Sequence, residues 1–430
     1  MEVTDSTPDS AFTGRNALKQ RIQERLLVRL DFSAMSLLDP IMLRAQLAML
    51  VMQILEEDGA AFSDTDREEV INDVMNEILG LGPLEPLLQD EEVSDILVNT
   101  ATHIYVERSG KLSLNPKRFR DNRHLRDVID KIVSRVGRRI DESSPMVDAR
   151  LEDGSRVNAI IPPLALDGPI LSIRKFCRER LQLEHLVTRG ALTQEIGEML
   201  KAMVYGRLNI LIAGGTGCGK TTMLNLLSGF IPAEERIITI EDAAELQLRQ
   251  DHVVRLETRP SNVEGKGEIS QRDLVRNSLR MRPDRIVLGE VRGPEALDML
   301  QAMNTGHDGS MTTVHSNSPR DALRRIEVMV LMAGMDLPLK AVREQIASSI
   351  DLIIHLERMK DGSRKVVQVT EVQGLEGDTI VLQDIFIYSY TSLRDGRVIG
   401  SLKATGLRPK FISKLKAYGI DLLDSVFAKS

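Results

Sequence analysis

Several residue types are scarce in this sequence, and each scarcity excludes a class of protein. Only two cysteines occur in 430 residues, Cys177 and Cys218, and no C-x-x-C pair is present. A disulfide framework and a zinc module are therefore not expected, and this cysteine usage favours a reducing cytoplasm. Aromatic residues make up only 3% of the chain, so the interleaved aromatics that stack on nucleic-acid bases are not expected either.

The sequence has neither a large net charge nor a long uninterrupted apolar run. The formal net charge is −7, from 56 basic and 63 acidic residues, so any basic site must be local. The first residues are acidic and polar and lack the apolar core of a signal peptide. The longest apolar stretch, residues 41–55, is interrupted by Arg44, Gln46 and Gln53 and is too short to span a bilayer. We therefore expect a cytoplasmic protein that reaches a membrane only through partners.

Periodicity and composition divide the chain into five parts. Residues 1–15 are polar and aperiodic, and we expect them to be disordered. Residues 16–82 contain three amphipathic stripes at helical spacing, which predict a three-helix bundle. Residues 83–180 predict an α+β domain, and residues 181–191 a charged linker. Strands and helices alternate in residues 192–430, which predicts an α/β domain with a parallel sheet and a C-terminal extension.

One stretch has a strong chemical signature. An apolar strand over residues 208–213 is followed by Gly214-Gly215-Thr216-Gly217-Cys218-Gly219-Lys220-Thr221-Thr222, which fits G-x-x-x-x-G-K-[ST]. Glycines allow successive N–H groups to converge on the α- and β-phosphates of a ligand at the start of a helix. We expect Lys220 to reach the β- and γ-phosphates and the Thr221 hydroxyl to bind Mg²⁺. An ordinary glycine-rich turn is the alternative, but the Lys-Thr pair and the flanking elements argue against it.

Polar groups follow several strands of the same predicted sheet. They are the glycine loop, Glu241 with Asp242, Glu290, and His315. Ligands of open parallel sheets lie at the carboxyl ends of the strands, so we expect these groups to converge. A lone acid at a strand end is usually a helix cap or a surface charge. Two acids beside a phosphate loop can serve the metal and the attacking water, which favours hydrolysis over binding alone.

These motifs, in this order, resemble those of the secretion and pilus ATPase superfamily. TIEDAAEL at residues 239–246 is similar to its Asp box, GEVRG at residues 289–293 to its atypical Walker B, and residues 306–317 to its His box. Residues 153–158 and 172–176, with the helical start, look most like the tight-adherence (Tad/Flp, CpaF-type) pilus ATPase. The metal-binding cysteine cluster of many type II secretion relatives is absent from the sequence.

The resemblance implies a homo-hexameric ring of subunits that each pair a PAS-like N-terminal domain with a RecA-like P-loop ATPase domain. It also implies roles for four residues. Glu241 would polarise the attacking water, Glu290 would hold Mg²⁺ through a water, and His307 and His315 would report the state of the γ-phosphate. Which glutamate is the base stays open. The alternative for either histidine is an ordinary core or loop residue.

Arginines form two further groups of interest. Arg156 and Arg174 each lie in a predicted strand, where a lone arginine is usually a solvated edge charge. With the resemblance, we expect both to donate to the γ-phosphate, because a guanidinium has a fixed charge and forked donors. The second group could face solvent, another subunit or nucleic acid; we expect a subunit contact, with Arg272 or Arg280 as arginine finger. Its members are Arg272, Arg276, Arg280, Arg282 and Arg285.

The function implied is ATP hydrolysis, with Mg²⁺, that powers assembly and also retraction of a Tad-type pilus through an inner-membrane platform. The alternatives are a type IV secretion traffic ATPase and a scaffold that binds nucleotide without turnover. No nucleic-acid partner is expected, because aromatic residues make up only 3% of the chain. A DNA translocase, a third class of function, would need DNA-stimulated turnover with steep salt dependence. A GTPase is disfavoured because the sequence has no N-K-x-D motif. Cys218 is expected to fill space in the loop, although an exposed thiol there would be open to inhibitory oxidation.

Overall fold

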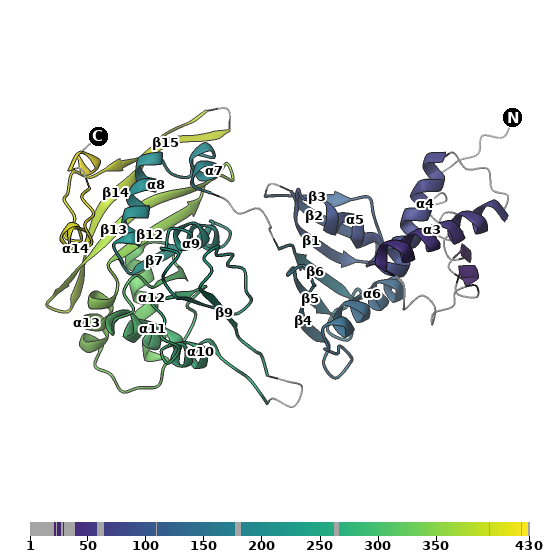
Figure 1. Ribbon diagram of the computed structural model, residues 1–430, viewed down its shortest axis with the longest axis horizontal. Coiled ribbons are helices and arrows are strands. Elements are labelled where there is room, and N and C mark those ends of the chain that lie inside the picture. The colour runs from purple at the N-terminus through teal and green to yellow at the C-terminus, as the bar shows by residue number, and fades with distance from the viewer. Residues whose placement is uncertain are drawn as a thin grey trace. The chain divides into compact units, whose positions relative to one another are not determined.

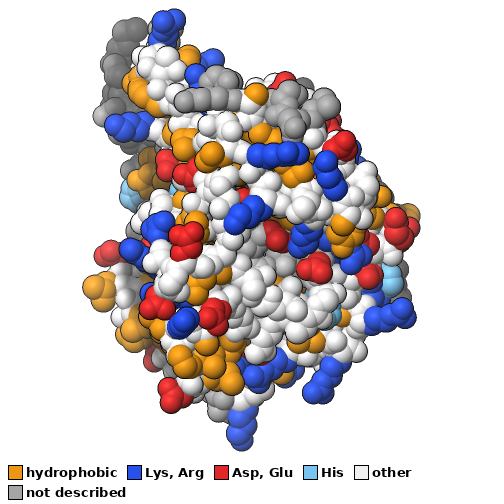
Figure 2. Space-filling model, turned by 90° about the vertical axis from the view of Figure 1, so that its left-hand side faces the viewer, with side chains coloured by type: hydrophobic (Ala, Val, Ile, Leu, Met, Phe, Trp, Pro, Cys, Tyr) orange, Lys and Arg blue, Asp and Glu red, His pale blue; other side chains and the backbone are white. Residues whose placement is uncertain are grey.

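The computed structural model describes residues 21–22, 24–26, 29, 39–57, 64–108, 110–176, 182–261, 266–394, 396–422 and 424–428 (Figure 1). The chain divides into two compact units, Met1–Cys177 and Arg178–Ser430, each with a hydrophobic core of its own. Within the described ranges, no helix is both long and apolar enough to cross a membrane. Figure 2 shows basic and acidic side chains interspersed over one face, which agrees with the small net charge.

The first unit begins with helices around a small apolar cluster. α3 (Pro40–Glu57) and α4 (Asp64–Leu79) supply most of it, and Ile22 and Leu26, from helical residues before them, join the same cluster. Apolar residues three or four apart place one stripe of each helix on this cluster. Most of the first predicted helix, and all of the stretch predicted to be disordered, lie outside the described residues.

A six-stranded antiparallel sheet follows, in the order β3-β2-β1-β6-β5-β4. η1 (Gly82–Leu84) and α5 (Glu85–Gln89) lead into it, and α6 (Asn122–Arg135) packs its apolar stripe on the sheet. Asp121 caps α6 by accepting the His124 N–H at 2.7 Å. The strands are β1 (Val93–Thr100), β2 (His103–Arg108), β3 (Lys111–Asn115), β4 (Met146–Arg150), β5 (Arg156–Ile160) and β6 (Ile170–Arg174).

The second unit is built on a nine-stranded sheet in the order β15-β14-β13-β12-β7-β11-β10-β8-β9. The strands from β12 to β9 are parallel, whereas β13, β14 and β15 extend the sheet as antiparallel hairpins. The predicted α/β class is confirmed. The strands are β7 (Ile210–Gly214), β8 (Ile237–Glu241), β9 (Val253–Glu257), β10 (Arg285–Leu288), β11 (Met311–His315), β12 (Leu352–Arg358), β13 (Arg364–Glu376), β14 (Thr379–Arg394) and β15 (Arg397–Ala404).

Helices cover both faces of this sheet (Figure 1). One face carries α7 (Leu183–Thr188), α8 (Gln194–Tyr205), α9 (Lys220–Ser228), α14 (Ile412–Ala417) and η2 (Asp424–Phe427). The other carries α10 (Gln271–Ser278), α11 (Glu295–Asn304), α12 (Pro319–Leu331) and α13 (Leu339–Ser349). Both faces are therefore apolar, which explains why β7, β8 and β10 are buried along their whole length.

Two segments outside the central sheet add to its core. The stretch expected to be a linker contains α7 instead, and Leu183 and Leu186 pack in the core of the second unit. Charged neighbours in the sequence obscured this short apolar pattern. Near the other end of the chain, Phe411, Ile412 and Leu415 are buried in the same core.

Candidate functional site

The glycine loop connects the end of β7 to the start of α9 at Lys220. Gly217 and Gly219 have φ angles of 70° and 100°, in the left-handed region that favours glycine. Gly214 is needed for space, because a Cβ there would lie 2.5 Å from the Leu356 carbonyl oxygen. The backbone thus takes the tight turn that the motif predicts, directly before a helix N-terminus.

Lys220 is held inside this loop. Its side chain is buried, and Nζ donates to the carbonyl oxygens of Gly214 at 3.1 Å and Gly215 at 3.0 Å. Burial lowers the pKa of Lys220 below its ordinary value, while the nearby Cys218 and Glu290 act in the opposite direction. The ammonium is therefore placed where a phosphate oxygen bound by the loop would be its strongest partner.

Strand register brings three predicted residues together at the carboxyl edge of the sheet. His315 pairs with Gly214 across β11 and β7, and β10 lies on the other side of β11. His315 Nε2 lies 3.0 Å from Glu290 Oε1, and Lys220 Nζ lies 3.4 Å from His315 Nδ1. Burial is the main cause that lowers the pKa of His315, against the opposing charge of Glu290. The imidazole is thus neutral at pH 7 and connects the lysine to the carboxylate.

Arg292 extends this chain of contacts, although the sequence interpretation gave it no role. It forms an ion pair with Glu290, and its Nη1 lies 3.4 Å from Asp242 Oδ2. Arg292 thereby joins the loop after β10 to the loop after β8. Its position two residues after Glu290, inside the Walker B-like motif, was the available signal.

Glu241 is buried at the end of β8, beside Gly289. Its carboxylate accepts the backbone N–H groups of Glu245 at 2.7 Å and Leu246 at 3.0 Å. Burial nevertheless raises its pKa to about 7. A Cβ on Gly289 would lie 3.0 Å from Glu241 Cγ, so the glycine of the Walker B-like motif makes room for this side chain. Glu241 can exchange a proton near neutral pH, which is suited to a general base.

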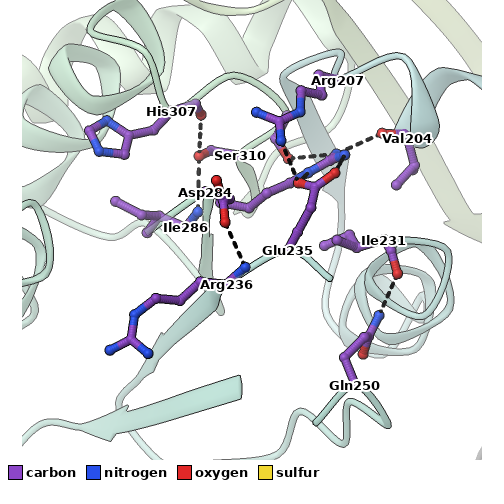
Figure 3. Close-up of polar contacts among 12 residues, drawn as sticks. Val204, Arg207, Ile231, Glu235, Arg236, Gln250, Asp284, Ile286, His307 and Ser310 are labelled. Atoms are coloured by element: carbon purple, nitrogen blue, oxygen red, sulfur yellow. Dashed lines mark hydrogen bonds and ion pairs between the residues drawn. The ribbon is translucent and has the colours of Figure 1, made fainter. Parts of the chain in front are cut away.

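The structure does not bring His307 to the phosphate loop of its own chain. His307 precedes β11, whose first residue Met311 pairs with Ile210, so it lies at the amino edge of the sheet. There its Nδ1 is 3.3 Å from the Ala302 oxygen. Its carbonyl accepts from Ser310 Oγ at 2.7 Å (Figure 3). The two histidines of one motif are thus separated by the length of β11.

The arginine group expected at a subunit contact is divided among different roles. Arg285 is fully buried at the amino edge and donates to both carboxylate oxygens of Glu235, at 2.7 and 3.0 Å. Arg207 pairs with the same Glu235 at 3.1 Å (Figure 3). A subunit contact is therefore wrong for Arg285. Arg272 and Arg276 both pair with Asp298, at 2.8 and 2.7 Å. The other two members, Arg280 and Arg282, are exposed.

In the first unit, Arg156 and Arg174 are register partners on β5 and β6. Arg150 on β4 pairs with Arg156 in turn, so three neighbouring strands each contribute an arginine. Arg174 also pairs with Asp95 at 3.0 Å, and two thirds of its side chain is exposed, at 66%. The sequence predicted two of these arginines and missed Arg150, whose strand it did not predict.

The residues present fit a magnesium ion that arrives with a nucleotide. Among the described residues, no cluster of three or more His, Cys, Asp or Glu side chains could hold a metal alone. Magnesium bound to a nucleotide needs only one or two protein oxygens, because phosphates and waters complete its octahedron. The Thr221 hydroxyl in the first turn of α9 and the Glu290 carboxylate are the oxygen donors that fit.

Cys218 does not have the environment of a reactive thiol. It is 1% exposed, and a Cβ on Gly214 would lie 2.5 Å from its Sγ. Burial raises the pKa of the thiol above its ordinary value, despite the nearby charges of Lys220 and Arg364. An oxidation-sensitive cysteine is therefore not supported, and the side chain fills space under the loop.

The comparisons with known proteins identify the family. Residues 77–384 match the family described as type II/IV secretion system protein, and residues 16–79 match the N-terminal domain of type II secretion system protein E. The chain belongs to the type II/IV secretion system protein family. The resemblance inferred from the motifs is thus confirmed at the level of the family, while its Tad branch stays a prediction.

Two relatives and one solved structure illustrate the similarity. A putative conjugal transfer protein of Mycobacterium tuberculosis is 37% identical over 320 residues, which cover 73% of this chain and 90% of the relative. The conjugal transfer protein TrbB of Rhizobium radiobacter is 32% identical over 291 residues, covering 67% and 86%. The VirB11 ATPase of the Brucella suis type IV secretion system, solved with sulphate, is 30% identical over 67% of this chain and 91% of that chain, with a TM-score of 0.37.

Proposed function

We propose that the second unit binds ATP with Mg²⁺ and hydrolyses it. The observation that supports this most strongly is the continuous contact of Lys220, His315 and Glu290 beside a glycine loop. It joins the ends of three neighbouring strands, which is where ligands of parallel sheets bind. An ordinary glycine turn needs neither a buried lysine nor a carboxylate within reach of it.

The proposed roles rest on the motifs and on the contacts and charges of the residues that carry them. The loop N–H groups and Lys220 bind the β- and γ-phosphates, and Thr221 and Glu290 hold Mg²⁺, which offsets phosphate charge when bound. Glu241, whose pKa is about 7, accepts the proton of the attacking water. Arg156 and Arg174, adjacent on β5 and β6, are proposed donors to the γ-phosphate. His315 senses that phosphate through Lys220, whereas His307 has no proposed role at the loop of its own chain.

Turnover of purified protein tests the proposal. Lys220→Ala removes the charge that faces the terminal phosphates, so we expect ATP hydrolysis to fall at least about 100-fold. Glu241→Gln and Glu290→Gln are expected to lower turnover while ATP still binds. Gln345→Ala, on α13 away from the carboxyl edge, is the matched control and should leave turnover unchanged. Wild-type protein that binds ATP without magnesium-dependent turnover would instead be the nucleotide-gated scaffold.

We further propose that a homo-hexamer of this chain, at the cytoplasmic face of the inner membrane, powers assembly and retraction of a Tad-type pilus through a membrane platform. The segments at 153–158 and 172–176 support this assignment. The names of the relatives, which include conjugal transfer proteins, favour a type IV secretion traffic ATPase as the second candidate. Deletion of the gene separates the two, because loss of surface pili with normal conjugal transfer supports the first, and the reverse supports the second.

A further inference from the structure

The glycine loop has a second flank, formed by the hairpin of β12 and β13. β7 lies between β11 and β12, and the contacts of Lys220 with His315 are on the β11 side. On the other side, Leu356 pairs with Gly214, and β12 continues for two residues to Arg358. Arg358 pairs in register with Arg364, the first residue of β13. Two arginines therefore stand beside the loop, opposite the catalytic groups.

Both arginines lie close to the loop backbone. Arg364 Nε donates to the Gly217 carbonyl at 2.9 Å, across 147 positions of sequence. A Cβ on Gly219 would lie 3.6 Å from Arg364 Cδ, and one on Gly217 would lie 3.8 Å from Arg358 Nη1. Both side chains are exposed. The bond to Gly217 uses one of five N–H donors of the guanidinium, so the Nη fork can still bind a phosphate oxygen.

The direction of a bound nucleotide follows from Lys220. The lysine of such a loop reaches the β- and γ-phosphates, and here its ammonium lies on the β11 side. The α-phosphate and the nucleoside must then leave the loop on the β12 side, toward Arg358 and Arg364. A planar guanidinium can both bind a phosphate oxygen and stack on an aromatic base.

We propose that Arg364 and Arg358 form the nucleoside end of the site: Arg364 binds the α-phosphate, and Arg358 covers the nucleobase. This subsite rests on the proposed ATP binding. It gives binding residues to the α-phosphate and the nucleobase, the part of ATP to which the four motifs assign none. It also explains why an arginine lies on each side of the hairpin turn, beside a loop that already has its own lysine.

Three ligands of increasing length test the subsite by titration calorimetry on the full chain with Mg²⁺. Pyrophosphate matches the β- and γ-phosphates alone. Tripolyphosphate adds a third phosphate, which corresponds to the α-phosphate, and ATP adds both the α-phosphate and the base. We expect Arg364→Ala to weaken ATP and tripolyphosphate about tenfold and to leave pyrophosphate within about twofold. We expect Arg358→Ala to weaken ATP about threefold to tenfold and to leave both inorganic ligands unchanged.

A purely structural role of the hairpin gives a different pattern. If the arginines only support the loop, each variant weakens all three ligands equally, and the proposal is overturned; it is also overturned if ATP binding does not change. Lys360→Ala, in the turn of the same hairpin, is the matched control and should bind all three like wild type. In steady-state turnover, Arg364→Ala should raise KM with little change in kcat. Wild-type protein that binds none of the ligands would refute the proposed function itself.

Discussion

The two edges of the nine-stranded sheet both contain arginine–glutamate pairs, but the arginine is buried at one edge and exposed at the other. At the amino edge, Arg285 is fully buried and uses two donors on Glu235. At the carboxyl edge, Arg292 pairs with Glu290 while 62% of its side chain stays exposed. A buried pair is costly to break, whereas an exposed one exchanges partners with little change in free energy. The same residue types thus form a fixed framework at one edge and a rearrangeable site at the other.

The largest expected effect tests this contrast in stability. Arg285→Met leaves Glu235 buried without its bidentate partner, so we expect the free energy of unfolding to fall by about 3–5 kcal/mol. Urea unfolding followed by circular dichroism measures it. Arg292→Met is the matched control, and its effect should stay within about 1 kcal/mol because that pair is exposed. Equal losses in the two variants would contradict the distinction between the edges.

The second prediction concerns the pH dependence of the carboxyl edge. Because burial raises the pKa of Glu241 from 4.5 to about 7, the folded protein favours the protonated acid and loses stability as pH rises through that range. Relative to Glu241→Gln, the wild type should lose roughly 3 kcal/mol of unfolding free energy between pH 4.5 and 8. Urea unfolding at several pH values measures the difference. Glu257→Gln, which changes an exposed residue on the adjacent strand, should show the same dependence of unfolding free energy on pH as the wild type. If the Glu241→Gln curve runs parallel to the wild-type curve, the raised pKa of Glu241 is excluded.

The smallest effect concerns the helix that starts after His315. Ser318 caps α12 by accepting the Asp321 N–H at 3.1 Å, so Ser318→Ala should cost about 1 kcal/mol and Ser318→Gly a few tenths. If the carboxyl edge rearranges independently, the loss should appear as faster hydrogen exchange of the backbone amides of residues 320–323 and only weakly in the melting temperature. Equally faster exchange at Val330, in the buried part of the same helix, would contradict a loss confined to the first turn.

The parts that the sequence predicted are those with local or topological signals. The glycine loop has a specific motif, and the convergence of Glu290 and His315 follows from the general rule for parallel strands. Burial of Arg285 could not be predicted, because a buried and an exposed arginine look alike in sequence, and its partner Glu235 is 50 residues away. The position of His307 could have been predicted, since a five-residue strand separates it from His315.

The end of the chain shows that the boundary of a family match is not a boundary of the fold. The match ends at residue 384, yet Phe411, Ile412 and Leu415 lie in the core beyond it. Leu415 fits so closely against Gly206, at the end of α8, that a Cβ there would lie 2.2 Å from its Cδ2. Expression of the unit alone thus requires the chain through at least α14. A shorter version would expose an apolar surface along α8. We expect the truncated protein to self-associate through that surface, which would then be covered by a second copy in place of the missing helix.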